Sequence, residues 1–114
     1  MPKTQPYTTT LYSRELKWSG TEKLIARKAF DLALKREFND LLRQTKQRIA
    51  KAKESADLWE LENFLFQRHR EIAVQFDFRY SVLPFVFADL IRKGRLSKED
   101  LRGLDDDKLD SSRF

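Results

Sequence analysis

The chain has 114 residues, a formal net charge of +5 and 36% charged residues, which is enough length for one domain with a modest core. It contains no cysteine, which excludes disulfides, thiolate metal sites and a cysteine nucleophile and favours a reducing cytoplasm. No apolar run approaches the roughly 20 residues that a membrane-spanning helix needs, so we expect a soluble, cytoplasmic protein without a membrane partner.

The polar N-terminal stretch, residues 1–18, shows no sustained periodicity. We expect an extended or disordered leader there, with neither a secretory signal nor an anchor. Ser19 and Glu22 have the spacing of a capping box, in which a hydroxyl and a carboxylate bind the free amides of a first helical turn. No proline interrupts the chain from there to about Lys53, so the pattern predicts one helix roughly 50 Å long. Residues 19–114 are predicted to form a single all-helical domain.

The second half of this long helix carries a narrow apolar stripe on a highly charged surface. The stripe consists of Leu34, Phe38, Leu41, Thr45, Ile49 and Ala52. Five basic residues and no acidic one lie between Arg43 and Lys53, and they point in nearly every direction except the stripe. This pattern is typical of coiled-coil-like pairing, either with another helix of the same chain or with a second molecule.

The next helix is predicted over residues 58–76, with Ser55 or Asp57 as its cap. Its main apolar stripe consists of Leu58, Leu61, Leu65, Ile72 and Phe76. The residues to one side of that stripe are Trp59, Phe66 and, farther round the helical wheel, Asn63. The helix therefore has two surfaces to bury, and we expect one to face the chain's own core and the other a second molecule.

A third helix is predicted to start at residue 78 or 79 and to end at Gly94, a residue type that favours the left-handed conformation of a helix end. Pro84 should kink this helix or mark a late start. Phe85 and Phe87 lie about 200° apart on it and cannot both face the same core. The helix must therefore be covered on several sides or offer a surface to a partner.

Residues that could carry chemistry are few. The single histidine, His69, falls on the apolar stripe of the second predicted helix, where a core or interface histidine is expected rather than a catalytic or metal-binding one. After a short fourth helix capped by Ser97, residues 105–107 are three aspartates that lack the alternating ligands of a calcium loop. We expect them to form a solvated acidic corner that leads into a tail. The sequence therefore predicts no enzyme, no metal and no cofactor.

Two function classes remain, a protein-binding regulator and a basic helical nucleic-acid binder. The first half of the chain is basic, and residues 43–53 offer phosphate contacts. Their charges are spread around the helix axis rather than gathered on one face, which disfavours nucleic acid as the partner.

The sequence also resembles a known family. The matching runs are WS at residues 18–19, RKAF at 27–30, DLWELENFL at 57–65, RHREI at 68–72, RYSV at 79–82 and FVFADLIRKG at 85–94. In order and spacing, over about residues 18–104, this set resembles the fluorescence recovery protein family.

The resemblance implies an all-helical homodimer with no cofactor and no enzymatic chemistry. Family members bind the C-terminal domain of the light-activated orange carotenoid protein, speed its return to the resting orange state and help it leave the phycobilisome. A cytoplasmic location, thylakoid-associated through the phycobilisome, is implied with it. In the family, the tryptophan that matches Trp59 lies in the dimer interface of a stem. The phenylalanine that matches Phe85 lies in a head region implicated in partner contact.

Three interface positions differ from the cyanobacterial members, and Pro84 and the longer leader are further departures. Glu62 and Asn63 stand where those proteins have His and Asp, and His69 stands where they have Arg. Because the Asp and the Arg change together, no buried charge is left unpaired and a dimer can survive. The predicted dimer interface consists of Trp59, Glu62, Asn63, Phe66 and His69, and the predicted partner-binding residues are Phe85 and Phe87. The alternatives are a homologue that regulates or scaffolds a different protein partner and, second, the basic nucleic-acid binder.

Overall fold

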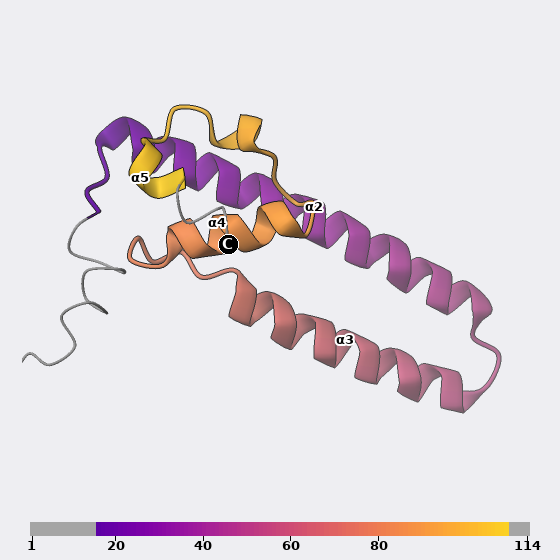
Figure 1. Ribbon diagram of the computed structural model, residues 1–114. Helices are drawn as coiled ribbons and strands as arrows, with labels where there is room; N and C mark the ends of the chain where they lie inside the picture. The colour runs from indigo at the N-terminus through magenta and orange to yellow at the C-terminus, as the bar shows by residue number, and fades with distance from the viewer. Residues whose placement is uncertain (1–15, 110–114) are drawn as a thin grey trace, which may run out of the picture.

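Figure 1 shows the computed structural model of the chain, which describes residues 16–109. The elements in order are α2 (Gly20–Lys51), α3 (Ser55–Gln75), α4 (Leu83–Arg92), the 3-10 helix η1 (Lys98–Leu101) and α5 (Asp106–Leu109). Over these residues the fold is all-helical, as predicted, and it contains no strand. No helix within residues 16–109 is both long and apolar enough to cross a membrane. Most of the predicted leader, residues 1–15, lies outside the described residues.

The start of α2 is the predicted capping box. The Glu22 amide donates to the Ser19 hydroxyl at 3.0 Å, and the Ser19 amide donates to the Glu22 carboxylate at 3.0 Å. The helix continues without a break for 32 residues, about 48 Å at 1.5 Å per residue. It ends where Ala52 turns to extended backbone.

After a short turn, α3 runs back antiparallel to the C-terminal half of α2 (Figure 1). The predicted cap of α3 needs correction. Ser55 is the first helical residue and Glu54 occupies the cap position. The Asp57 carboxylate, three residues into the helix, accepts hydrogen bonds from the amides of Lys53 and Glu54 at 2.8 and 3.1 Å. We call this hairpin, α3 with residues 34–51 of α2, the stem.

The third helix starts late, at Leu83, and the residues before it form a turn. Pro84 is its second residue, where the missing amide donor costs no helical hydrogen bond, so the helix is not kinked. Gly94 follows the helix with a φ of 77°, the left-handed conformation predicted for this helix end. We call α4, η1, α5 and their connections the head.

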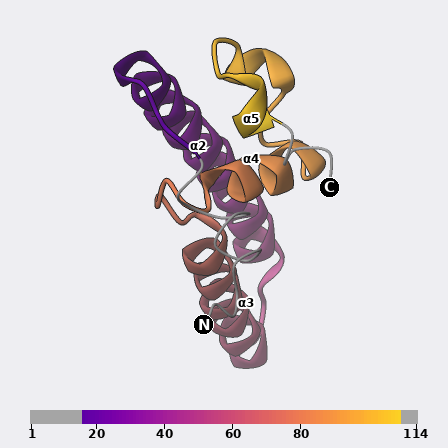
Figure 2. The ribbon, with the colours of Figure 1, turned by 60° about the vertical axis from the view of Figure 1, so that its left-hand side comes forward.

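The hydrophobic core lies between the head and the N-terminal half of α2. Small alanines on α2 pack with apolar residues of α4 in one cluster, and Figure 2 shows α4 crossing α2 with α5 on the same side. The core consists of Ala26, Ala29, Phe30, Ala33, Leu83, Val86, Phe87, Leu90, Leu96, Leu101 and Leu104. The stem takes no part in it, because none of the residues of α3 is buried.

Residues 106–109 form a helix, where the sequence predicted the start of a tail; the predicted tail beyond residue 109 lies outside the described residues. The side chains of residues 105–107 are exposed as expected, but residues 106–109 form α5. Lys108 of α5 is buried and its ammonium group lies 3.1 Å from the Glu22 carboxylate. The buried carboxylate of Glu22 needs a cation beside it, and this requirement holds the end of the described chain against the start of α2.

Candidate protein-interaction site

The stem exposes an apolar surface that this chain does not cover. On α3, Trp59 is 64% exposed, Phe66 55% and Leu58 52%. On α2, the large exposed apolar residues of the stem are Leu34, Phe38, Leu42 and Ile49. Leu41 and Thr45, from the same predicted stripe, are half-buried. A hairpin of two helices buries only the sides that face each other, so the remaining apolar side chains are available to another molecule.

An apolar groove of about 500 Å³ lies along one side of the hairpin. It is lined by Leu34, Phe38 and Ile72, with Asp31 and Lys35 at its edge. The groove therefore brings Ile72, from the apolar stripe of α3, to the same side of the hairpin as Leu34 and Phe38 of α2.

All the residues of the predicted dimer interface are exposed in the single chain. These are Trp59, Glu62, Asn63, Phe66 and His69. On a wheel of 100° per residue they occupy roughly one third of the circumference of α3, next to the stripe that lines the apolar groove. Trp59 and Asn63 also border a second groove of about 560 Å³, where the Arg48 guanidinium lies 3.9 Å from the centre of the Phe64 ring. Trp59 thus lies at the border of this second groove, not of the apolar one.

In the head, the structure separates the two phenylalanines named as partner-binding residues. Phe87 is 1% exposed and belongs to the core, packed with residues of α2. Phe85 is half-buried on the other side of α4. A side chain inside the core cannot reach a partner without unfolding the head, so Phe87 supports the packing of α4, whereas the Phe85 side chain is partly exposed.

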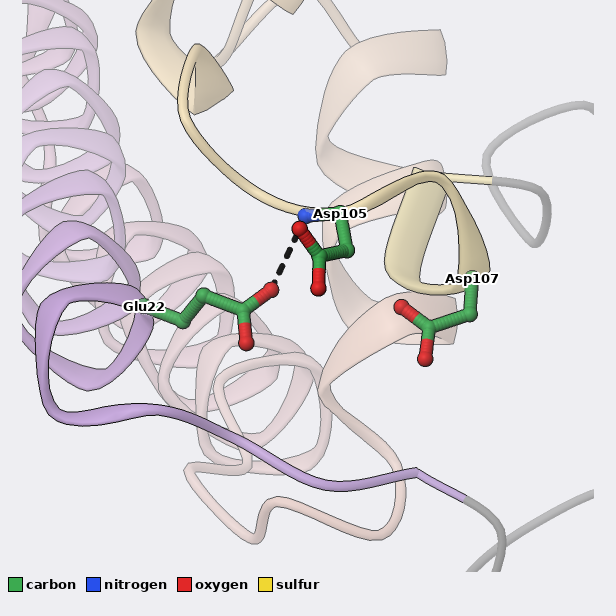
Figure 3. Close-up of side chains that lie close together, drawn as sticks. All are labelled: Glu22, Asp105 and Asp107. Atoms are coloured by element: carbon green, nitrogen blue, oxygen red, sulfur yellow. Dashed lines mark hydrogen bonds between the residues drawn. The ribbon is translucent and has the colours of Figure 1, made fainter.

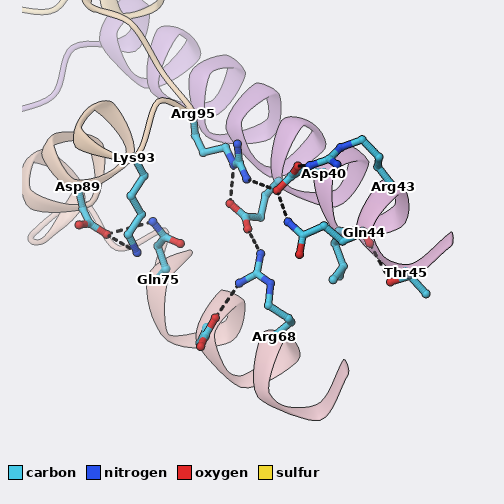
Figure 4. A network of polar contacts seen from close by, with 12 residues as sticks. Asp40, Arg43, Gln44, Thr45, Arg68, Gln75, Asp89, Lys93 and Arg95 are labelled. Carbon is cyan, nitrogen blue, oxygen red and sulfur yellow. Dashed lines mark hydrogen bonds and ion pairs between the residues drawn. The ribbon is translucent and has the colours of Figure 1, made fainter. Parts of the chain in front are cut away.

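A polar network, which the sequence did not predict, joins the stem to the head (Figure 4). The Glu37 side chain is only 6% exposed, and its carboxylate accepts from Arg68 of α3 and, at 2.7 Å, from Arg95 after α4. Arg95 also donates to Asp40 at 3.0 Å. Burial raises the pKa of the Glu37 carboxyl, but the hydrogen bonds and charges of Arg95 and Arg68 outweigh it and hold the pKa below its ordinary value.

A second buried carboxylate, Glu22, lies near Asp105 and Asp107, and Figure 3 shows the three side chains close together. Three carboxylates within 4.8 Å of one another could hold a metal ion. Here the Lys108 ammonium lies 3.1 Å from Glu22 and 3.2 Å from Asp107, in the place that a cation would take. The Asp105 amide also donates to Glu22 at 2.9 Å. The cluster is therefore accounted for as an internal ion pair.

The two buried carboxylates make stability depend on pH. Burial raises the pKa of Glu22 too, but amide and Lys108 contacts outweigh it, so both Glu22 and Glu37 titrate below the ordinary value of about 4.3. An unfolded chain then binds more protons than the folded one at acidic pH. The contribution of these two carboxylates to the free energy of unfolding is present when the pH is above their ordinary pKa. It is lost as the pH falls through their lower pKa values in the folded chain. We expect the melting temperature to drop by several degrees or more between about pH 6 and about pH 3.

Circular dichroism melts across this pH range are the measurement. A Glu37→Gln variant removes one of the two titrating groups, so its melting temperature should fall less steeply with acid than that of the wild type. A wild-type melting temperature that stays constant down to pH 3, or a variant with an unchanged slope, would contradict the assignment.

Comparison with known proteins places these surfaces in context. A family model described as "Photoprotection regulator fluorescence recovery protein" matches residues 18–112. The fluorescence recovery protein of Synechocystis sp. is 36% identical over 98 residues, covering 86% of this chain and 90% of that protein.

Solved structures of fluorescence recovery proteins match as well. The structure from Fremyella diplosiphon is 41% identical, with a TM-score of 0.79, and covers 86% of this chain and all of that chain. The structure from Synechocystis sp. is 34% identical, with a TM-score of 0.80, and covers 85% of this chain and 95% of that one.

Proposed function

The chain belongs to the fluorescence recovery protein family of photoprotection regulators, and from this premise we propose that it is a non-enzymatic, dimeric regulator of an orange carotenoid protein. It binds the C-terminal domain of the photoactivated form and accelerates its return to the resting orange state, which ends photoprotective quenching. It acts in the cytoplasm, at the thylakoid-associated phycobilisome. The observation that carries the proposal is the family match over nearly the whole described chain.

The dimer forms through the stem. Both stem helices expose apolar residues, and a second copy of the chain offers the same surface in return. A dimer through α3 removes from water large apolar side chains that the single chain leaves exposed, such as Trp59 and Phe66. The proposed interface is centred on Trp59, with Glu62, Asn63, Phe66 and His69 around it.

Charges along α3 favour an antiparallel arrangement of the two copies. The first half of the helix carries Asp57, Glu60 and Glu62 and no basic residue, whereas the second half is mainly basic. Antiparallel packing about a two-fold axis near Phe66 sets Glu62 opposite His69 of the partner subunit. Parallel packing would instead bring carboxylate against carboxylate, which is unfavourable.

The client binds the head. Phe85 is half-buried on α4, which is anchored to α2 by the core residues on its other side, among them Phe87. A rigid helix that presents a partly exposed aromatic side chain is suited to a protein contact, because little conformational entropy is lost on binding. A regulator without chemistry works by preferring one conformation of its client or the transition between conformations.

The proposal is tested by binding to both forms of an orange carotenoid protein. The expected result is a higher affinity for the illuminated form, and for the isolated C-terminal domain, than for the dark-adapted resting form. Equal affinity for the two forms would refute selection between conformations. Absence of binding to either form, with the dimer intact, would assign the same surfaces to a different protein client.

Nucleic acid is not favoured as the partner by the structure. Within residues 43–53, Arg43 pairs with Asp40 and Arg48 stacks on Phe64, so two of the five basic side chains already have partners in the chain. The remaining lysines, Lys46, Lys51 and Lys53, are exposed. A salt-sensitive gel shift with DNA or RNA is the result that would revive this alternative.

A further inference from the structure

We propose that Glu37 is a positioning residue that fixes the head on the stem by holding Arg68 of α3 and Arg95 of the head at the same time. This inference rests on the proposed function for its consequence, because the stem carries the proposed dimer surface and the head the proposed client surface. The structural claim itself concerns only the contacts of the single chain.

The Glu37 carboxylate binds one arginine from α3 and one from the head. One of its oxygens accepts from Arg95 at 2.7 Å and the other accepts from Arg68. Each arginine has a second acceptor, Asp40 for Arg95 at 3.0 Å and Glu71 for Arg68 at 2.7 Å. Arg68 and Arg95 are mostly buried, so these charge-assisted bonds are shielded from water and are stronger than exposed ones.

The network also includes the backbone that follows α4. Arg36, one residue before Glu37, donates to the Arg95 carbonyl at 2.8 Å and to Asp100 at 2.9 Å. Neighbouring residues of α2 therefore bind the side chain and the backbone of Arg95. Figure 4 shows Arg95 reaching the side of α2 from the head and Arg68 reaching it from α3.

Apolar packing alone does not fix this junction. The core joins the head to the N-terminal half of α2, whereas α3 buries none of its residues. Beside the Glu37 network, the Gln75 amide donates to Asp89 at 3.0 Å, between the end of α3 and α4. Phe76, directly after α3, packs on the core against Phe30 and anchors the end of the helix. The rest of α3 is held to the head by polar contacts, which are directional and are lost when one partner changes.

The location of the network gives it a functional role. Arg68 precedes His69, which lies on the proposed dimer surface, and Arg95 follows the helix that carries Phe85. Loss of the network leaves the apolar stem surface and the core of the head intact, but the orientation of the stem relative to the head is then no longer fixed. We expect a client that touches the head of a dimer to bind more weakly when this angle is no longer fixed.

Glu37→Gln is the direct test, because glutamine keeps the size but offers one acceptor oxygen and places an NH₂ group against an arginine. The expected result is faster backbone amide exchange, by about tenfold, over residues 68–75 and 93–102, with unchanged exchange in residues 83–92. Light scattering should still give a dimer, and the affinity for the C-terminal domain of the client should fall by about tenfold. Glu99→Gln is the matched control, because it removes a carboxylate from the exposed pair with Arg102, and it should change none of these readouts.

Arg95→Gln is a second variant, for use if Glu37→Gln does not fold, because it leaves the pair of Glu37 and Arg68 in place. It should raise amide exchange over residues 93–102, whereas residues 68–75, still held by the pair of Glu37 and Arg68, should exchange much as in the wild type. Exchange unchanged in both variants, or raised uniformly through stem and head, would overturn the positioning role. The exchange readout needs no client, so it decides this inference even if the wild type proves not to bind an orange carotenoid protein.

Discussion

Trp59→Glu is expected to convert the protein from a dimer to a monomer at micromolar concentration. The indole is 64% exposed in the single chain, and the proposed interface buries it in a second copy. A carboxylate there would lose the apolar contact and would carry a charge into the interface without a partner. Aromatic residues at the centre of an interface cost about 2 kcal/mol or more when removed, roughly a 30-fold weaker dimer.

Mass by light scattering is the readout, with a fall from twice the chain mass of 13.6 kDa to that mass. The single chain should stay folded, because Trp59 is outside the core and α3 buries none of its residues. Leu24→Glu is the matched control, since Leu24 is 74% exposed but lies on the N-terminal part of α2, outside the stem. A dimer that persists in Trp59→Glu, or dissociates equally in Leu24→Glu, would refute the stem assignment.

Phe85→Glu is expected to remove most of the acceleration of carotenoid-protein recovery while leaving the dimer intact. Phe85 is half-buried on α4, so a charged side chain can extend into water without opening the core. The client would then meet a carboxylate in place of an aromatic ring, and its own apolar surface would lose a partner. The dark recovery time of a photoactivated orange carotenoid protein, with wild type and variant at equal concentration, measures the effect.

Phe87→Ala separates a loss of contact from a loss of folding. Phe87 is 1% exposed, and truncating a buried phenylalanine to alanine costs about 3 to 5 kcal/mol. We expect this variant to melt far below the wild type, whereas Phe85→Glu should melt close to it. Recovery unaffected by Phe85→Glu, or a Phe85→Glu variant as unstable as Phe87→Ala, would contradict the assignment of Phe85 to the client surface.

Local signals predicted the helices well because they act over a few residues. The capping box of Ser19 and Glu22 set the start of α2, and Gly94 set the end of α4. Pro84 left two alternatives open, a kink or a late start, and the structure has the late start. The cap of α3 was predicted at Ser55 or Asp57 and the helix from residue 58, but the helix starts at Ser55, because the Asp57 carboxylate binds the free amides from the third helical position.

The contacts between distant residues could not be predicted in this way. Glu37 and Arg95 are 58 residues apart, and Lys108 and Glu22 are 86 residues apart. In a sequence with 36% charged residues, each of these side chains resembles an exposed surface charge. Only the fold shows that they are brought together and buried.

The wheel of the third helix showed that Phe85 and Phe87 face opposite ways, but not which one is inside. That choice depends on which side of α4 meets the small residues of α2, Ala29 and Ala33 among them. The apolar excess of α3, by contrast, was visible in the sequence, and the structure leaves that helix without a buried residue. In the proposed dimer, a second copy of the chain covers this helix.

The most direct test of the proposed function is the dark recovery of a photoactivated orange carotenoid protein from the organism that encodes this chain. Recovery is followed by absorbance with and without the protein, added below the concentration of its client. The proposal predicts faster recovery that rises with the amount of protein and reaches all of the client, as expected for a regulator that is released and acts again. A recovery time unchanged at equal or higher concentration, with the dimer confirmed in the same sample, would contradict it.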